Sequence, residues 1–156
     1  MQRDELLALM RSMRAELEGF VAMHAVEPGA VIGGGWTLHD AVAHVALWDR
    51  MAVRKITGEP LPEGEDVASR EPWNLDAFND EMRARMTSRP MSDVLTEFDA
   101  AWLAIVRAVE GANEADCRPG ERVWEAVDDD SVGHYPRHFP IRDLLREQQR
   151  PSSGDS

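Results

Sequence analysis

Three of the five histidines in the chain have the spacing of a metal site. His134 and His138 are four residues apart, so a helix would place both rings on one face, with Cβ atoms about 5–6 Å apart. One metal ion can bridge two imidazoles at that separation. The same face continues through Ile141, Leu145 and Gln148, so we expect the pair to point into the protein. A neutral imidazole pair that faces a core needs hydrogen-bond partners or a metal.

Two prolines bear on this argument, because Pro136 and Pro140 flank His138. Proline is tolerated in the first turn of a helix but costs about 3 kcal/mol or more further in. A helix that begins near Gly133 keeps Pro136 in its first turn and is kinked at Pro140. If the helix begins only at Pro140, the spacing no longer brings the rings together, and the two histidines are surface or capping residues.

His44 supplies a third ligand from a distant part of the chain. It lies in a helical pattern close to Asp40 and Trp48, at the border of the apolar face. Three nitrogen ligands leave one position open for water or substrate, as in catalytic zinc sites. For His44 alone, the alternative is a histidine at the core edge that is hydrogen-bonded to a carboxylate. We predict one divalent ion per chain, held by His44, His134 and His138.

The acidic and hydroxyl groups near these histidines are the candidate catalytic residues. A metal on three imidazoles lowers the pKa of a bound water or thiol and so produces a nucleophile near neutral pH. Asp40 or Asp49 could orient His44 or act as a general base. Tyr135 could donate a hydrogen bond to a developing oxyanion. The alternative for Asp49 is a surface carboxylate, in solvent or paired with Arg50.

The other histidines and the tryptophans have structural interpretations. His39 directly precedes Asp40 and is expected to face outward. His24 ends the first apolar stripe, where an imidazole stabilises a helix C-terminus; a position behind the metal ligands is the alternative. Four tryptophans are expected to fill the core or the wall of a pocket: Trp36, Trp48, Trp73 and Trp102.

The elements that must position these groups are helices. Apolar residues recur at three- and four-residue spacing along most of the chain, and strand patterns are nearly absent. Capping residues, glycine and proline mark the ends of each periodic stretch. The sequence predicts an all-α, antiparallel four-helix bundle with helices over 3–26, 37–56, 74–87, 91–111 and about 131–149. The helices 74–87 and 91–111 are expected to form one broken column.

The segments between these helices have the composition of turns and loops. Residues 31–35 are rich in glycine and predict a flexible turn, and 58–72 predict a long loop. Residues 112–130 predict irregular structure, with a short turn or strand-like piece at 123–127. We expect one bundle domain over residues 1–149 and a disordered tail over 150–156.

Composition narrows the class of protein. Hydrophobic residues make up 43% and charged residues 29% of the 156 residues, which is typical of one globular soluble domain. The net charge of -12 repels phosphate backbones and anionic lipid, so we expect neither a nucleic acid nor a membrane partner. The N-terminus lacks a signal-peptide pattern. Cys117 is the only cysteine, which excludes a disulfide within the chain and favours a cytoplasmic location.

Three motifs together resemble the DinB-like (damage-inducible) superfamily. The first is Gly34-Gly-Trp-Thr-Leu-His-Asp-Ala-Val-Ala-His-Val-Ala-Leu-Trp48, in which a Trp-Thr opening leads to a histidine eight residues on. The second is His134-Tyr-Pro-Arg-His138. With the segment Trp73-Asn-Leu-Asp-Ala-Phe-Asn79, they look most like the ClbS/DfsB branch. The resemblance covers roughly residues 3–148.

This resemblance implies a fold and a cofactor. The fold is an up-down-down-up bundle with a long crossover between its second and third helices. The cofactor is a nickel or zinc ion on the three histidines of the motifs, which are His44, His134 and His138 here. Relatives include thiol-dependent S-transferases, a maleylpyruvate isomerase and ClbS, a self-resistance protein that opens a cyclopropane in a genotoxin.

Three functions remain open at the level of sequence. The first is a hydrolase or thiol S-transferase that acts on a small electrophile in detoxification or self-resistance, with a low-molecular-weight thiol as a further partner. The second is a non-catalytic bundle that sequesters a small ligand. The third is a bundle with vestigial histidines that works through oligomerisation, for which a homodimer is the simplest form.

Overall fold

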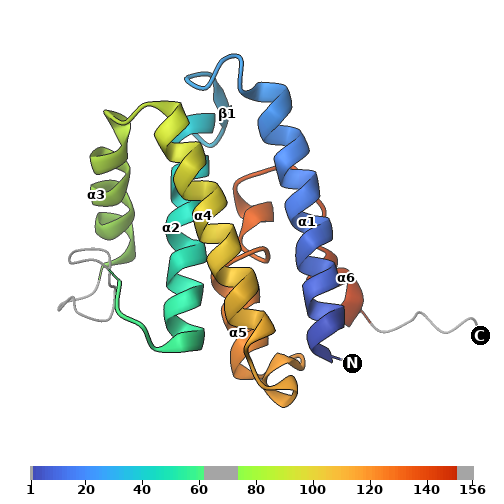
Figure 1. The fold of residues 1–156 in the computed structure, drawn as a ribbon. Helices are drawn as coiled ribbons and strands as arrows, with labels where there is room; N and C mark the ends of the chain where they lie inside the picture. Colours follow the sequence, from blue (N-terminus) through green and yellow to red (C-terminus); the bar gives the residue numbers. More distant parts are fainter. Residues whose placement is uncertain (1, 62–73, 151–156) are drawn as a thin grey trace, which may run out of the picture.

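The computed structural model describes residues 2–61 and 74–150. Within these ranges the chain forms six α-helices, one hairpin and two short 3-10 helices (Figure 1). In chain order they are α1 (Gln2–His24), β1 (Val31–Gly33), β2 (Trp36–Thr37), α2 (Leu38–Thr57), α3 (Leu75–Thr87), α4 (Met91–Glu110), η2 (Glu114–Cys117), α5 (Arg122–Asp130), η3 (Tyr135–Arg137) and α6 (Leu144–Gln149). Trp73 and most of the predicted loop 58–72 and tail 150–156 lie outside the described residues.

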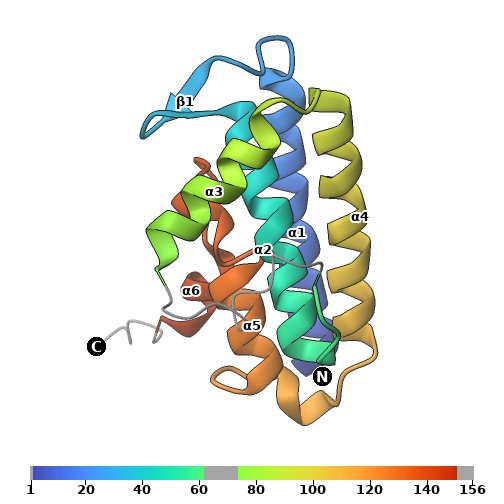
Figure 2. The same cartoon turned by 90° about the vertical axis from the view of Figure 1, so that its left-hand side faces the viewer.

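The helices form the predicted all-α bundle with up-down-down-up order (Figures 1 and 2). α1 runs up from the N-terminus, and α2 runs back down from the hairpin. α3 carries the chain to the upper end again, so it belongs to the crossover, and α4 then runs down beside α2. α5 starts the return from the lower end. Along the described ranges, no helix combines the length and the apolar character needed to span a membrane.

The prediction that α3 and α4 form one broken column is wrong. The turn at 88–90 reverses the chain, so α3 packs beside α2 and runs antiparallel to α4 (Figure 2). Backbone hydrogen bonds from Arg89 to Met86 and from Asp93 to Pro90, both 3.0 Å, close this turn. Pro90 has a φ of -64° and no N–H, which suits the start of a helix and prevents the continuation of the preceding one.

The predicted helix over about 131–149 is wrong in its first two thirds. Residues 131–143 form turns and the short helix η3, and α6 begins only at Leu144. Pro136 and Pro140 remove two backbone donors, which excludes a regular α-helix here. Backbone bonds of 3.1 Å from Arg137 to His134 and of 3.0 Å from His138 to Tyr135 keep the segment compact instead.

The second half of the segment 112–130, predicted to be irregular, is helix α5. Val123 and Val127 are one turn apart and fully buried, whereas Glu125 and Asp129 on the other side are exposed. Aspartate and β-branched residues are weak helix formers, so local propensity gives little signal over this stretch. The burial of one face against α2 supplies the stability that propensity does not.

The predicted turn 31–35 is part of a hairpin that leads into α2. Gly34 and Gly35 have φ values of 57° and 80°, a left-handed conformation that glycine adopts without strain. This two-residue turn pairs β1 with β2 in an antiparallel register. The Thr37 hydroxyl then accepts a 3.1 Å hydrogen bond from the Asp40 backbone and caps α2. The hairpin therefore fixes Trp36 at the entrance to the helix that carries His44.

The apolar residues form two separate cores. The larger lies among α1, α2, α4, α5 and the C-terminal segment. The smaller joins α3 to one patch of α2, and within α3 only Phe78 and Met82 are buried. α3 therefore has an attachment of its own, composed of Leu47, Met51, Phe78 and Met82 with Trp48 and Leu61 at its margin.

We expect Phe78→Ala to loosen α3 without unfolding the main bundle. Truncation of a buried phenylalanine typically costs about 3–5 kcal/mol, and Phe78 contributes only to the smaller core. Amide hydrogen exchange should accelerate across α3, while α1 and α4 keep wild-type protection. Leu103→Ala, at a residue on α4 that is 54% exposed, is the control and should alter neither. Equal acceleration in all helices would contradict an independent attachment of α3.

Candidate metal centre

Three imidazole rings converge on one face of α2. His44 comes from α2, and His134 and His138 come from the turns around η3. The Nε2 atoms of His134 and His138 are 2.9 Å apart, and one nitrogen of each ring lies within 4.8 Å of the others. Within residues 2–61 and 74–150, this is the one group of three or more histidine, cysteine or acidic side chains that converges in this way.

The spacing and chemistry of these rings fit a divalent ion. Zinc binds imidazole nitrogen at about 2.0–2.1 Å, which in a tetrahedral site separates two ligand nitrogens by roughly 3.3 Å. The observed separations bracket that value. His134 is 7% exposed, and its Nδ1 has no hydrogen-bond partner in the described part of the chain. The donor set therefore has the number and the kind of atoms that a catalytic zinc or nickel site requires.

Burial keeps the three rings neutral. Desolvation, with a smaller repulsion from His138, lowers the pKa of His44 to about 3. Desolvation and the neighbouring imidazoles lower the pKa of His134 to about 2. The less buried His138 has its pKa lowered by desolvation and by Arg137. Only a neutral imidazole has the lone pair that a metal needs, so the site is ready for an ion at neutral pH.

The rings line an open cleft of about 380 Å³ between α2, α3 and the C-terminal segment. Trp36 and Trp48 form aromatic parts of its wall, as predicted for a pocket wall. At the same cleft, Lys55 Nζ lies 2.6 Å from Asp130 Oδ2. Among residues 2–61 and 74–150, the buried indole N–H of Trp48 and the Asn79 Oδ1 find no hydrogen-bond partner, and neither does His134 Nδ1. The lining residues are Trp36, His44, Trp48, Lys55, Leu75, Asn79, Asp129, Asp130, His134, Arg137 and His138.

Trp36 contacts two of the three clustered imidazole rings directly. Its ring centroid is 4.9 Å from that of His44 and 5.3 Å from that of His138. The guanidinium of Arg83 lies over its outer side, 4.9 Å from the ring centroid. The hairpin thereby places an aromatic ring where it limits the access of water to two of the three imidazoles.

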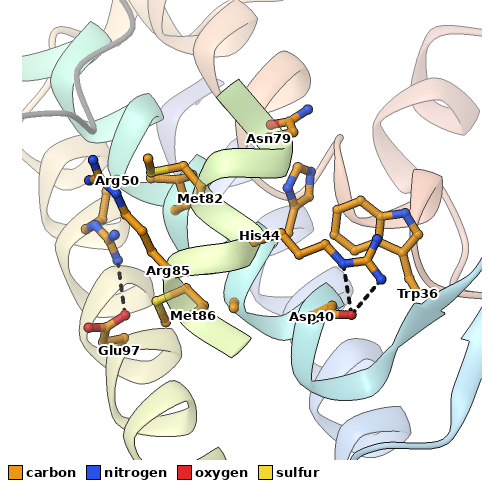
Figure 3. Close-up of a pocket in the computed structure, with 12 residues that line it drawn as sticks. Trp36, Asp40, His44, Arg50, Asn79, Met82, Arg85, Met86 and Glu97 are labelled. Atoms are coloured by element: carbon orange, nitrogen blue, oxygen red, sulfur yellow. Dashed lines mark hydrogen bonds and ion pairs between the residues drawn. The ribbon is translucent and has the colours of Figure 1, made fainter. Parts of the chain in front are cut away.

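Asp40 lies near His44 but is bonded elsewhere. Both residues line a small cavity between α2, α3 and α4, with Trp36 beside them (Figure 3). The Asp40 carboxylate accepts a 3.1 Å hydrogen bond from Arg83 Nε, and Arg83 Nη2 lies 2.9 Å away. The carboxylate thus holds α3 against the start of α2, and no hydrogen bond joins it to His44 within the described residues.

A model of the mycothiol maleylpyruvate isomerase N-terminal domain family matches residues 6–147. The chain belongs to this family. The match spans all three histidines and nearly every helix. The family is part of the DinB-like superfamily, so the predicted relationship is confirmed at that level. No curated protein and no solved structure matches the chain.

In this member of the family, Asp49 and Tyr135 lie in the core rather than in the cleft lining. Both are 0% exposed, which contradicts the reading of Asp49 as a surface charge. The two carboxylate oxygens accept 2.7 Å hydrogen bonds, one from Ser131 and one from the Tyr135 hydroxyl. Arg14 Nη1 lies 3.7 Å from the carboxylate. Burial raises the pKa of Asp49 to about 6, and Arg14 and the two hydroxyl donors oppose that rise.

Arg14 is the buried partner that the sequence interpretation missed. It is 2% exposed, and it donates to the Tyr135 hydroxyl and to the Phe98 carbonyl, both at 3.2 Å. The signal was available, because Arg14 lies four residues after Met10 and three before Leu17 on the apolar stripe of α1. A cation on a core face requires a buried anion, and Asp49 is the charge among the core positions of α2.

The two remaining histidines contact backbone carbonyls. His39 is not an outward surface residue: its Nε2 lies 2.6 Å from the Arg89 carbonyl, and the side chain is 15% exposed. This contact joins the start of α2 to the turn before α4. His24 lies at the end of α1, where its Nδ1 is 2.9 Å from the Phe20 carbonyl and its ring stacks on Phe20. His24 therefore has the predicted position at a helix end, away from the three clustered rings.

Gly133 permits the turn that presents His134. Its backbone packs on Asp128, and an added Cβ would overlap the Asp128 carbonyl oxygen and lie 2.5 Å from the Asp128 Cα. The Gly133 N–H bonds to the Val127 carbonyl at 3.2 Å, which folds the segment back on α5. Only glycine fits this approach without a shift of the backbone.

We expect Gly133→Ala to reduce both stability and metal affinity. The new methyl group collides with backbone rather than with a mobile side chain, so the turn that carries His134 must move. Zinc affinity, measured by competition with a chromophoric chelator, should fall by about tenfold or more. Gly19→Ala is the matched control, because its Cβ meets no atom within 4 Å and α1 gains a better helix former. Wild-type affinity in Gly133→Ala would contradict this account.

The pH dependence of metal binding should reflect the lowered pKa values. Unperturbed histidines titrate near pH ~6.5, but these three have lower pKa values and stay neutral below that point. Protons therefore compete with the metal only at lower pH, with the less buried His138 protonated first. Zinc affinity should be constant from about pH 8 to 6.5, stay constant as the pH falls through the ordinary histidine pKa of ~6.5, and decline only at lower pH. A decline of about tenfold per pH unit that begins at pH ~6.5 or above would show that the rings are not desolvated.

Proposed function

We propose that the chain is a metal-dependent enzyme that acts on a small electrophilic molecule, by hydrolysis or by transfer of a low-molecular-weight thiol. The observation that carries this proposal is the convergence of His44, His134 and His138 at an open cleft. A divalent zinc or nickel ion on three imidazoles, when bound, lowers the pKa of a water or thiol. The family to which the chain belongs is named for a mycothiol-dependent isomerase, which favours the thiol as partner.

The residues of the cleft have separate roles in this proposal. The three histidines hold the ion, and the Trp36 ring restricts the approach of bulk water to it. Asp40 lines a small cavity together with His44, and release from Arg83 would free it to act as a base. Asp49 and Tyr135, the other two, reach the cleft only through the segment 131–138. An orienting role therefore suits them better than proton transfer to substrate.

The biological setting that we propose is detoxification or self-resistance. The motifs at 34–48, 73–79 and 134–138 resemble the ClbS/DfsB branch, whose member ClbS opens a cyclopropane in a genotoxin. An open cleft with aromatic walls suits a small, partly apolar electrophile. A cytoplasmic location and a homodimer remain predictions of the sequence.

We expect about one zinc or nickel ion per chain in protein purified without a nickel column. His134→Ala or His138→Ala should abolish this binding, because each removes one of three nitrogen ligands. His24→Ala, which changes a histidine away from the cluster, is the control and should retain the ion. Full metal content in both His134→Ala and His138→Ala would refute the assignment of the site.

A measurement of turnover distinguishes an enzyme from a bundle that only binds its ligand. The metal-loaded protein should consume several equivalents of an electrophile such as an epoxide when a thiol is supplied, and His44→Ala should not. Conversion of one equivalent without turnover would identify the second function, the binding of a ligand without catalysis. The absence of both metal and turnover would leave a bundle with vestigial histidines.

A further inference from the structure

Of the two segments that carry the three clustered histidines, one is a regular helix and the other consists of turns. His44 lies in the middle of α2, where helical hydrogen bonds fix its backbone. His134 and His138 lie in turns, whose backbone bonds from His134 to Ser131, at 2.8 Å, and from His138 to Tyr135, at 3.0 Å, remain within the segment. Such local bonds define the shape of the segment 131–138, but they do not determine where it sits on α2.

Asp49 forms direct side-chain hydrogen bonds between these two segments. It follows His44 on α2 by five residues, and its two oxygens bind Ser131 and Tyr135, each at 2.7 Å. Ser131 precedes His134 by three residues, and Tyr135 follows it directly. The Asp49 carboxylate therefore binds the segment 131–138 through one residue before His134 and one residue after it.

Arg14 fixes the direction of this contact. Its guanidinium donates to the Tyr135 hydroxyl at 3.2 Å, so that oxygen accepts from Arg14 and donates its own proton to Asp49. A further bond to the Phe98 carbonyl and a distance of 3.4 Å from the Arg14 Cζ to the Phe98 ring centroid hold the guanidinium on α4. The four side chains Arg14, Asp49, Ser131 and Tyr135 are 2% exposed or less.

Apolar side chains in place of this network would stabilise the core without the desolvation cost of a buried ion pair. The burial of an ion pair costs desolvation free energy, and apolar residues of similar volume often stabilise a core equally well or better. Hydrogen bonds differ from apolar contacts in that they specify direction and register. A segment without regular secondary structure, on which two ligands depend, is the place where such specification matters.

We propose that Asp49 is a positioning residue, which acts through Ser131 and Tyr135 to hold His134 and His138 at the distance from His44 that one metal ion requires. This inference rests on the proposed metal site. It assigns Asp49 and Tyr135 to the geometry of the site, with no contact to substrate. Removal of the Ser131 or the Tyr135 hydroxyl should therefore make the positions of His134 and His138 less fixed, even when the bundle stays folded.

The experiment uses Co²⁺ as the probe in the full chain. Tyr135→Phe and Ser131→Ala each remove one hydroxyl and leave the carboxylate in place. Each should weaken Co²⁺ binding by about tenfold or more, the usual effect of losing a group that orients metal ligands, and should alter the visible absorption bands of bound Co²⁺. The matched control is Val109→Ala, a buried residue of α4 outside the network, which lowers the melting temperature but should leave affinity and bands unchanged.

Two outcomes separate this inference from the proposed function. If wild-type protein binds Co²⁺ and both hydroxyl variants bind it with wild-type affinity and bands, the positioning role is refuted and the metal site stands. If wild-type protein binds no Co²⁺, the proposed function fails, and NMR of the imidazole ring protons in metal-free protein decides the positioning role. Shifted His134 and His138 signals in Ser131→Ala, but not in Val109→Ala, support that role; unchanged signals overturn it.

Discussion

The buried carboxylate of Asp49 is the contact on which the arrangement of this domain depends. It joins α2 to the segment 131–135 through two hydroxyl donors, and through Arg14 it reaches α1 and α4. A charged carboxylate at 0% exposure is unstable unless it is matched by donors and by an opposite charge. Ser131, Tyr135 and Arg14 must therefore be in place together, which links the packing of three helices to the position of one turn.

Burial affects the three imidazoles differently from the Asp49 carboxylate. Desolvation of Asp49 is compensated by Arg14, whereas no acidic side chain compensates the desolvation of the clustered histidines in the described residues. The rings are left neutral and close together, with the Nε2 atoms of His134 and His138 only 2.9 Å apart. His134 Nδ1 has no hydrogen-bond partner in the described part of the chain, and an ion bound to neutral imidazoles would stabilise the folded state.

α3 buries fewer side chains against the rest of the domain than α1, α2, α4 or α5. It rests on its own small apolar cluster, on the contact of Arg83 with Asp40 and Trp36, and on Met86, which packs against the larger core. Leu75 and Asn79 of this helix line the cleft that also holds the three clustered histidines, so its position helps to set the width of that cleft. A small interface that borders a site allows the site to adjust to a ligand without disturbing the main core.

The sequence by itself determined the helical class, the main helix ends at Thr37, Asn74 and Gly111, and the identity of the three clustered histidines. Periodicity and capping are local properties, so they can be read without the fold. Only the tertiary structure decided how the histidines meet. The predicted helix is absent at 131–143, and turns permitted by Gly133 and attached through Asp49 bring the rings together. Those contacts join residues more than eighty positions apart, and no local pattern encodes a pairing at that distance.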